Sequence, residues 1–296
     1  MTPLLRILAI LVVASTAWSG PAAARAALDI ELRARELAAG EGVRIDITST
    51  VPLESLTCSF LGERVFMIRT GDARSWSGWS MIDLDRKAGS AVVEARGVGL
   101  DGATVLGTRA VPIAHKDFPQ EHLKVAPKYV EPPKAIRERI AREKAKLAVI
   151  YARREPWAPP AEPFIRPVPG KPTSIFGSRR VFNGKPRAPH SGLDLRAATG
   201  TPVLCSGPGR VVLAEELYYS GNLVIVDHGG GLFTLYAHLS RIDVEEGQDI
   251  RPGEQVGLSG ATGRVTGPHL HWGAKIDNRP FDPRSLVDPV LFGDRN

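Results

Sequence analysis

The sequence predicts a mainly β protein, with two β-rich regions joined by a basic helix. Three observations support this fold class. Short segments in which apolar and polar residues alternate fill the first third of the chain, and one later segment between prolines has helical spacing instead. In addition, 18 of the 30 glycines fall between Gly170 and Gly273, which suits short strands joined by tight turns. We therefore expect an N-terminal β-sandwich, a linker helix and a compact antiparallel β domain at the C-terminal end.

Composition sets the first limits on function. The length of 296 residues suits two domains, and a hydrophobic fraction of 43% excludes collagen and wholesale disorder. The formal net charge is +6, and removal of a leader that contains Arg6 and Arg25 leaves 36 − 32 = +4. This mild excess favours an anionic environment such as a cell wall and gives no reason to expect nucleic acid. Cys58 and Cys205 are expected to be buried thiols, with an interdomain disulfide as the alternative.

The first 26 residues have the pattern of a secretory signal peptide. Arg6 precedes a compact apolar run at residues 7–17, and Ala24-Arg25-Ala26 fits an A-x-A cleavage site. The alternative is an uncleaved anchor, but the apolar run is short for a bilayer. We therefore expect residues 1–26 to be removed and the mature protein to be exported, to the periplasm, with no stable membrane span.

Residues 27–115 are predicted to form the N-terminal β-sandwich domain, with an immunoglobulin-like arrangement. The expected strands are short and regularly spaced, as in such sandwiches. They cover residues 28–32, 43–47, 56–60, 64–69, 79–84, 91–98 and 105–113. Trp76 and Trp79 are expected to pack in the core or cover a hairpin, because this segment offers no cluster of catalytic residue types.

Residues 116–162 are predicted to form a linker with a basic helix. Pro133 precedes the helix and Pro156 follows it, and apolar residues recur between them at helical spacing. Those apolar residues are Ile136, Ile140, Leu147 and Ile150. We expect a solvated helix packed along one domain, with binding to a membrane or an acidic polymer as the alternative. The proline-rich run at 157–169 should be extended.

Residues 163–296 contain the side chains that could bind a metal or take part in catalysis. His190 and Asp194 are four apart, and in an extended segment they share one face. His269 and His271 are two apart, so on a strand both rings project from the same face. His238 ends an alternating strand, from which its side chain can reach a groove.

This set of residues suits metal-assisted hydrolysis. A catalytic zinc ion keeps three protein ligands and one open position, and imidazole and carboxylate are both good ligands. Further imidazoles near the metal can move protons and hold a developing oxyanion. Spacing alone leaves open which of His269 and His271 is a ligand. The chain has no H-E-x-x-H motif, which excludes the helical zinc-protease plan.

Five short motifs in this region resemble those of the lysostaphin/LytM-type zinc metallopeptidases, which act on peptidoglycan. The motifs are His190 to Leu195, Gly200 to Val203, Tyr236 to Leu239, Thr262-Gly263 and Gly267 to His271. Residues 174–180 are similar to the opening motif of that family, and the resemblance covers about 163–289. It implies one Zn²⁺ per chain, held by His190, Asp194 and His271. It also implies that His238 and His269 are the catalytic pair.

The sequence gives less specific predictions for the other polar residues of the chain. His228 matches a turn position of the family and is expected to be structural, while His115 and His122 should lie on the surface. The substrate-binding residues are unknown at this point. Several side chains could line a groove or equally lie in surface loops: Arg180, Asn183, Tyr218, Tyr219 and Asn222.

The expected function follows from the resemblance. An exported chain that keeps all five site residues is expected to be a zinc-dependent murein endopeptidase that hydrolyses peptide cross-links of peptidoglycan. A D-Ala–diaminopimelate cross-link is the favoured bond. The alternative is a non-catalytic LytM-type regulator of other murein hydrolases. The N-terminal β domain is expected to bind the wall or a protein partner, with occlusion of the groove as the alternative.

Overall fold

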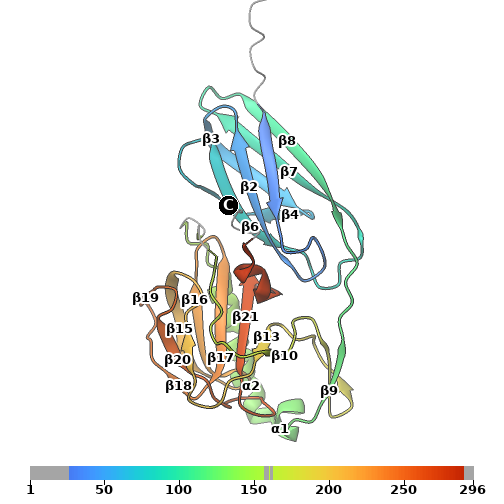
Figure 1. Cartoon of the computed structure of the whole chain (residues 1–296), viewed down its shortest axis with the longest axis vertical. Helices are drawn as coiled ribbons and strands as arrows, with labels where there is room; N and C mark the ends of the chain where they lie inside the picture. The colour runs from blue at the N-terminus through green and yellow to red at the C-terminus, as the bar shows by residue number, and fades with distance from the viewer. Residues whose placement is uncertain (1–26, 157–159, 161–162, 290–296) are drawn as a thin grey trace, which may run out of the picture.

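A computed structural model describes residues 27–156, 160 and 163–289 of the chain, so the signal-peptide prediction lies outside the described residues. It contains an N-terminal β-sandwich, a C-terminal β region and a linker that runs down the side of both (Figure 1). The prediction of a mainly β fold is confirmed. Within the described residues, no helix combines the length and the apolar composition that a membrane span requires.

Two four-stranded antiparallel sheets form the N-terminal sandwich, in the orders β1-β2-β6-β5 and β4-β3-β7-β8. Their strands are β1 (Leu28–Arg33), β2 (Gly42–Ser49), β3 (Leu53–Phe60), β4 (Glu63–Val65), β5 (Met67–Arg69), β6 (Ser75–Met81), β7 (Gly89–Gly99) and β8 (Thr104–Ile113). Burial alternates along β7, where Ala91, Val93 and Ala95 face the shared core. An immunoglobulin-like identity of this sandwich stays a prediction.

Several strand boundaries differ from those expected, and two of the differences change the pairing. The segment 64–69 is divided at Phe66, because β4 pairs with β3 in one sheet and β5 pairs with β6 in the other. The expected strand 79–84 begins earlier, at Ser75, since Ser75 and Trp76 pair with β2. Cys58 and Cys205 are both buried free thiols, as expected.

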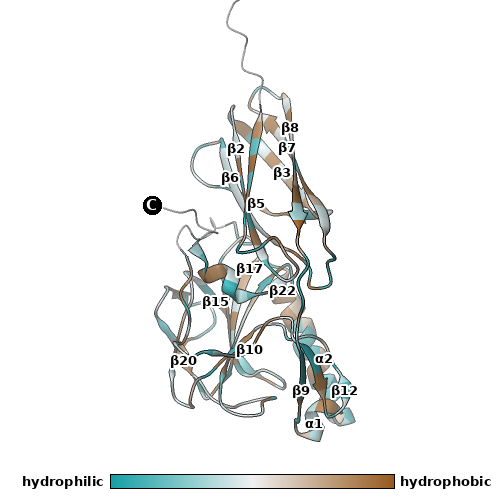
Figure 2. Ribbon diagram, turned by 45° about the vertical axis from the view of Figure 1, so that its right-hand side comes forward, coloured by the Kyte–Doolittle hydropathy of each residue, from teal (hydrophilic) through white to brown (hydrophobic). Residues whose placement is uncertain are grey.

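The linker contains more structure than the predicted helix. It holds β9 (Gln120–Leu123), the short helix α1 (Pro127–Val130) and α2 (Lys134–Tyr151). Strand β9 was not expected, because its polar sequence has no strand periodicity; it forms because β11 (Arg179–Phe182) offers a parallel partner. Figure 2 shows β9, β12 and both helices gathered at the end of the molecule remote from the sandwich.

An eight-stranded antiparallel sheet forms the core of the C-terminal region, in the order β10-β13-β21-β17-β16-β15-β19, with β22 paired to β21. Its strands are β10 (Pro172–Ser174), β13 (Leu193–Leu195), β15 (Gly209–Leu217), β16 (Gly221–Asp227), β17 (Leu232–Leu239), β19 (Asp249–Ile250), β21 (Leu270–Ile276) and β22 (Arg279–Phe281). Smaller sheets contain β12 (Lys185–Pro186), β14 (Pro202–Leu204), β18 (Arg241–Ile242) and β20 (Gln255–Leu258), and the 3₁₀ helix η1 (Pro283–Val287) follows.

The large sheet is covered on both faces. One face packs against a core that includes Tyr236 and Trp272, each fully buried. The other face receives the last turn of α2, where the Tyr151 ring meets the Phe233 ring edge-on at 5.3 Å between centroids. This two-sided burial explains why β17 is buried along its whole length and reads as a continuous apolar strand.

A buried cluster of charges joins the sandwich to the C-terminal region. The Arg35 guanidinium donates to Glu41 Oε1 at 2.6 Å and to Asp282 Oδ2 at 2.9 Å. Glu41 is fully buried and also accepts from the Ser285 hydroxyl at 2.8 Å and from Lys116. Because each carboxylate oxygen has a partner, the charges are compensated and hold the two regions in one relative position.

Apolar side chains complete this interface. Trp79 and Met81 of β6 pack in one cluster with Phe281 and Leu286. Trp79 is therefore a packing residue, as expected, but it lies between the two regions rather than inside the sandwich.

Loss of the Glu41 carboxylate should destabilise the protein. We expect Glu41→Ala to lower the free energy of unfolding by about 3 kcal/mol, the lower end for breaking a buried ion pair. The cost is limited because Arg35 keeps Asp282 and Lys116 keeps Glu36 as partners. The control Glu36→Ala removes a more exposed carboxylate and should cost less than about 1 kcal/mol. Denaturant unfolding of both variants tests this, and equal losses would contradict it.

Candidate metal centre

The pairing of β13 with β21 places two candidate ligands side by side. Asp194 lies directly opposite His271 in this antiparallel register. Their neighbours Leu193 and Trp272 are fully buried on the core side. Because successive side chains of a strand point to opposite faces, Asp194 and His271 emerge together on the other face.

His190 completes a triangle of possible metal ligands. Its Nε2 lies 3.0 Å from Asp194 Oδ1 and 3.0 Å from His271 Nδ1, and the latter two atoms are 2.8 Å apart. Three donor atoms this close can all lie within about 2.1 Å of one ion. The structure therefore brings together the three residues that the resemblance implies as ligands.

The surroundings of His190 fix which of its nitrogens faces the triangle. Its Nδ1 lies 3.0 Å from the carbonyl oxygen of Ile175 and 2.9 Å from the hydroxyl of Ser174. A carbonyl oxygen only accepts, so Nδ1 carries the proton and the lone pair of Nε2 points at Asp194 and His271. Burial lowers the pKa of His190 to about 4, which keeps the ring neutral and able to bind a metal.

Asp194 is held as a carboxylate. Its Oδ2 accepts from the Arg180 guanidinium at 2.8 Å, which leaves Oδ1 for the triangle. Burial opposes ionisation of Asp194, but hydrogen bonds with His190 and His271 outweigh it and hold the pKa of this carboxyl well below its usual range. Arg180 in turn donates to Ser174 Oγ at 3.1 Å, and Ser174 donates to the Glu121 carboxylate at 2.9 Å.

His238 and His269 lie beside the triangle. Their ring centroids are 4.9 Å apart, and His238 lies 5.9 Å from His271. The Nδ1 atom of each ring lies 2.8 Å from a backbone carbonyl oxygen, that of Thr262 for His238 and that of Gly267 for His269. Each ring therefore donates through Nδ1, and its Nε2 is free to accept a proton. Burial and the nearby His271 and His269 lower the pKa of His238 to about 3, so its ring is neutral near pH 7.

A distorted backbone directs His238 into the site. Its φ of +64° is in the left-handed region, which is unusual for a residue with a side chain. The register of β16 and β17 shifts here, between Asn222 and Val224, which adds one residue to β17. Asn222 supports this bulge by donating from Nδ2 to the Leu239 carbonyl at 3.0 Å.

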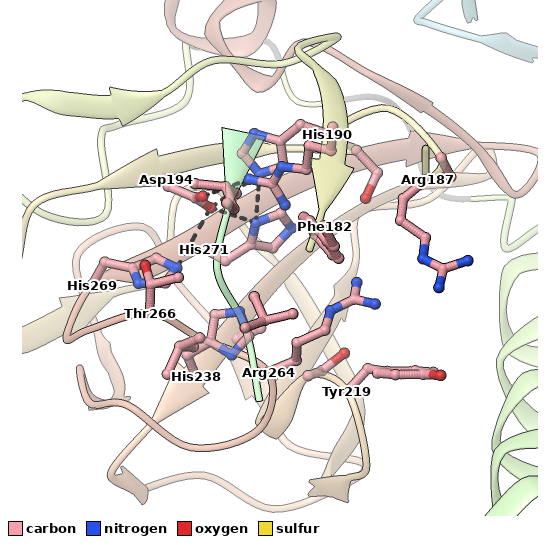
Figure 3. A pocket seen from close by; sticks show the side chains of 18 of the residues that line it. Phe182, Arg187, His190, Asp194, Tyr219, His238, Arg264, Thr266, His269 and His271 are labelled. Carbon is pink, nitrogen blue, oxygen red and sulfur yellow. Dashed lines mark hydrogen bonds and ion pairs between the residues drawn. The ribbon is translucent and has the colours of Figure 1, made fainter. Parts of the chain in front are cut away.

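The five side chains line one cavity of about 370 Å³. Figure 3 shows them at its base, with Arg187, Phe182, Arg264 and Tyr219 along one side. Two imidazole nitrogens and a carboxylate oxygen, open to a cavity on the remaining side, form the donor set of a catalytic zinc site. The residues present thus fit Zn²⁺.

The other residues singled out in the sequence have separate places. His228 is buried outside the cluster, with Pro208 O and Thr234 Oγ1 as partners of its two nitrogens, so it is structural. His115 and His122 are exposed, as expected. Tyr219 lines the cavity, whereas the Tyr218 hydroxyl donates to the linker at Lys128 O.

Several residues at the site were missed from the sequence. Leu123 and Val125 of the linker line the cavity, and Glu121 lies next to Arg180. Asn183 holds this segment, since its side chain accepts from Val125 N at 3.1 Å and donates to Val125 O at 2.8 Å. Nothing in the sequence marks these contacts, because they join segments about 60 residues apart that have no shared motif.

Comparison with known proteins agrees with this geometry. Residues 188–283 match the model of peptidase family M23. The C-terminal region is an M23 domain. The matched residues include the five at the base of the cavity, whereas Leu123, Phe182 and Arg187 of its wall lie outside the match.

The related sequences are named for peptidoglycan chemistry. The peptidoglycan DD-endopeptidase ShyA of Vibrio cholerae is 47% identical over 119 residues, 40% of this chain and 28% of that protein. The DD-carboxypeptidase/endopeptidase Mpg of Neisseria meningitidis is 44% identical over 101 residues, 34% of this chain and 23% of that protein. The alignments thus span about a quarter of the length of these curated relatives.

One solved structure resembles most of the chain. A crystal structure from Pseudomonas aeruginosa, assigned to peptidase M23, superimposes with a TM-score of 0.63 at 29% identity. The superposition covers 87% of this chain and 96% of the other. The likeness therefore extends beyond the M23 domain to the arrangement of the N-terminal sandwich.

A glycine between two candidate ligands of the M23 domain should be sensitive to substitution. A Cβ atom at Gly192 would lie 2.6 Å from Trp272 O and 2.7 Å from the His271 ring, both too close. We expect Gly192→Ala to displace His271 and to weaken zinc binding about 10–100-fold, as loss of ligand support does. The control Gly267→Ala meets no atom within 4 Å and should bind zinc normally. Zinc affinities from chelator competition test this, and equal affinities would contradict it.

Proposed function

We propose that the chain is a zinc-dependent metalloendopeptidase that hydrolyses peptide cross-links of peptidoglycan. His190, Asp194 and His271 hold one Zn²⁺, and His238 and His269 are the catalytic pair. The observation that supports this most directly is the triangle of ligand atoms, each within 3.0 Å of the others, with two proton-accepting imidazoles beside it.

In this proposal each side chain has a separate role. A bound zinc ion polarises a carbonyl oxygen and lowers the pKa of a coordinated water to about 7. His238 and His269 present an unprotonated Nε2, so either can take the proton of the attacking water. A ring that has taken this proton can then donate it to the amine that leaves. The backbone carbonyls at Thr262 and Gly267 keep both rings in this tautomer throughout.

The names of the relatives guide the choice of bond. Both ShyA and Mpg are named for DD-endopeptidase activity. A D-Ala–diaminopimelate cross-link is a DD bond, and the proposed substrate of this chain is therefore that cross-link. Export through residues 1–26 and a periplasmic location stay predictions, and so does a protein partner of the N-terminal sandwich.

A non-catalytic regulator is less well supported. Such a role requires no particular geometry at the histidines. Here His190 is held in the tautomer of a metal ligand and Asp194 is held as a paired carboxylate, and His238 keeps a left-handed backbone that costs stability. These features favour catalysis.

Two histidine substitutions separate metal binding from catalysis. His271→Ala leaves two protein ligands, and we expect it to lose zinc and activity together. His238→Ala should keep stoichiometric zinc but lose activity on murein sacculi by about 10²-fold or more, because a proton acceptor is lost. The exposed His115→Ala serves as the control and should retain both properties.

Metal analysis of each purified variant, paired with digestion of sacculi, gives the result. Stoichiometric zinc in His271→Ala would overturn the ligand assignment. Loss of zinc from His238→Ala would make His238 a ligand, and full activity there would make it structural.

A further inference from the structure

Arg264 is a cation in the wall of the cavity. Its guanidinium lies 5.0 Å from the centre of the Phe182 ring and 4.6 Å from that of Tyr219. These two rings hold it in place by cation–π contacts. Among residues 27–156, 160 and 163–289, no carboxylate forms an ion pair with it.

The surrounding charge makes this position suitable for an anion. Arg180 and Arg187 line the same cavity. Burial and these two neighbouring cations lower the pKa of Arg264, yet an arginine remains charged at neutral pH. Arg180 is paired with Asp194, and Arg187 donates to the Val130 carbonyl, whereas the Arg264 guanidinium is left to face the cavity (Figure 3). An anion that enters would relieve this repulsion and gain a planar, bidentate partner.

Building on the proposed function, we propose that Arg264 is a specificity-determining residue that binds a free carboxylate of the substrate peptide next to the scissile bond. A D-Ala–diaminopimelate cross-link has such a group, because the carbon attached to the scissile nitrogen bears a carboxylate. Arg264 and His238 line the same cavity, so the carboxylate is held while His238 handles the proton.

Two matched substrates test this role. One is a soluble cross-linked peptide with a D-Ala–diaminopimelate bond, and the other is the same peptide with that carboxylate converted to an amide. We expect the wild-type chain to prefer the carboxylate form and Arg264→Met to lower kcat/KM for it about 10–100-fold, the value of a charged hydrogen bond. The amidated peptide should change little. Arg264→Lys should be intermediate, because it keeps the charge without the planar fork.

The controls separate this role from others. Arg251→Met removes an exposed arginine outside the cavity and should leave both rates unchanged. Zinc content should be normal in every variant. Equal losses on both peptides in Arg264→Met would overturn the proposal and make Arg264 a packing residue. A zinc-loaded wild-type chain that cleaves neither peptide nor sacculi would overturn the proposed function and this inference with it.

Discussion

The antiparallel pairing of β13 with β21 is the constraint on which the site depends. It sets Asp194 opposite His271, and the strand alternation that buries Leu193 and Trp272 turns both polar side chains to the same open face. A shift of one residue in this register would exchange the two faces, placing a carboxylate and an imidazole in an apolar core. The packing that stabilises the sheet therefore also holds the candidate metal ligands in position.

Backbone carbonyls orient three of the histidine rings at the site. The backbone carbonyls of Ile175, Thr262 and Gly267 each accept a hydrogen bond from Nδ1 of one histidine. Three rings therefore have an unprotonated Nε2, and their Nδ1 atoms are held by the backbone instead of by acidic side chains. Such contacts fix both tautomer and ring orientation. Thr262 and Gly267 lie in the loop before β21, and Ile175 directly follows β10. The arrangement is organised before a metal or substrate arrives, which reduces the reorganisation that binding and reaction require.

The N-terminal sandwich affects the site from a distance. The buried carboxylates of Glu41 and Asp282 share Arg35, and Trp79 packs against Phe281, so the sandwich and the M23 domain have a fixed relative position. The linker connects these two regions, and its path places β9 next to β11, beside the candidate metal ligands. The same segment then walls the cavity that contains Arg264. The wall of the cavity is thus formed by the linker as well as by the C-terminal region.

The sequence by itself determined the mainly β class and the helix that became α2, and it singled out the five residues that the structure brings to one cavity, because these depend on local periodicity and on short motifs with fixed spacing. It could not reveal β9, in which three polar residues and Leu123 become a strand only when β11 is near. Nor could it reveal Arg264 between Phe182 and Tyr219, or Glu41 between Arg35 and Ser285. Only the tertiary structure decided these, since their energies come from contacts between segments far apart in sequence, which no local pattern records.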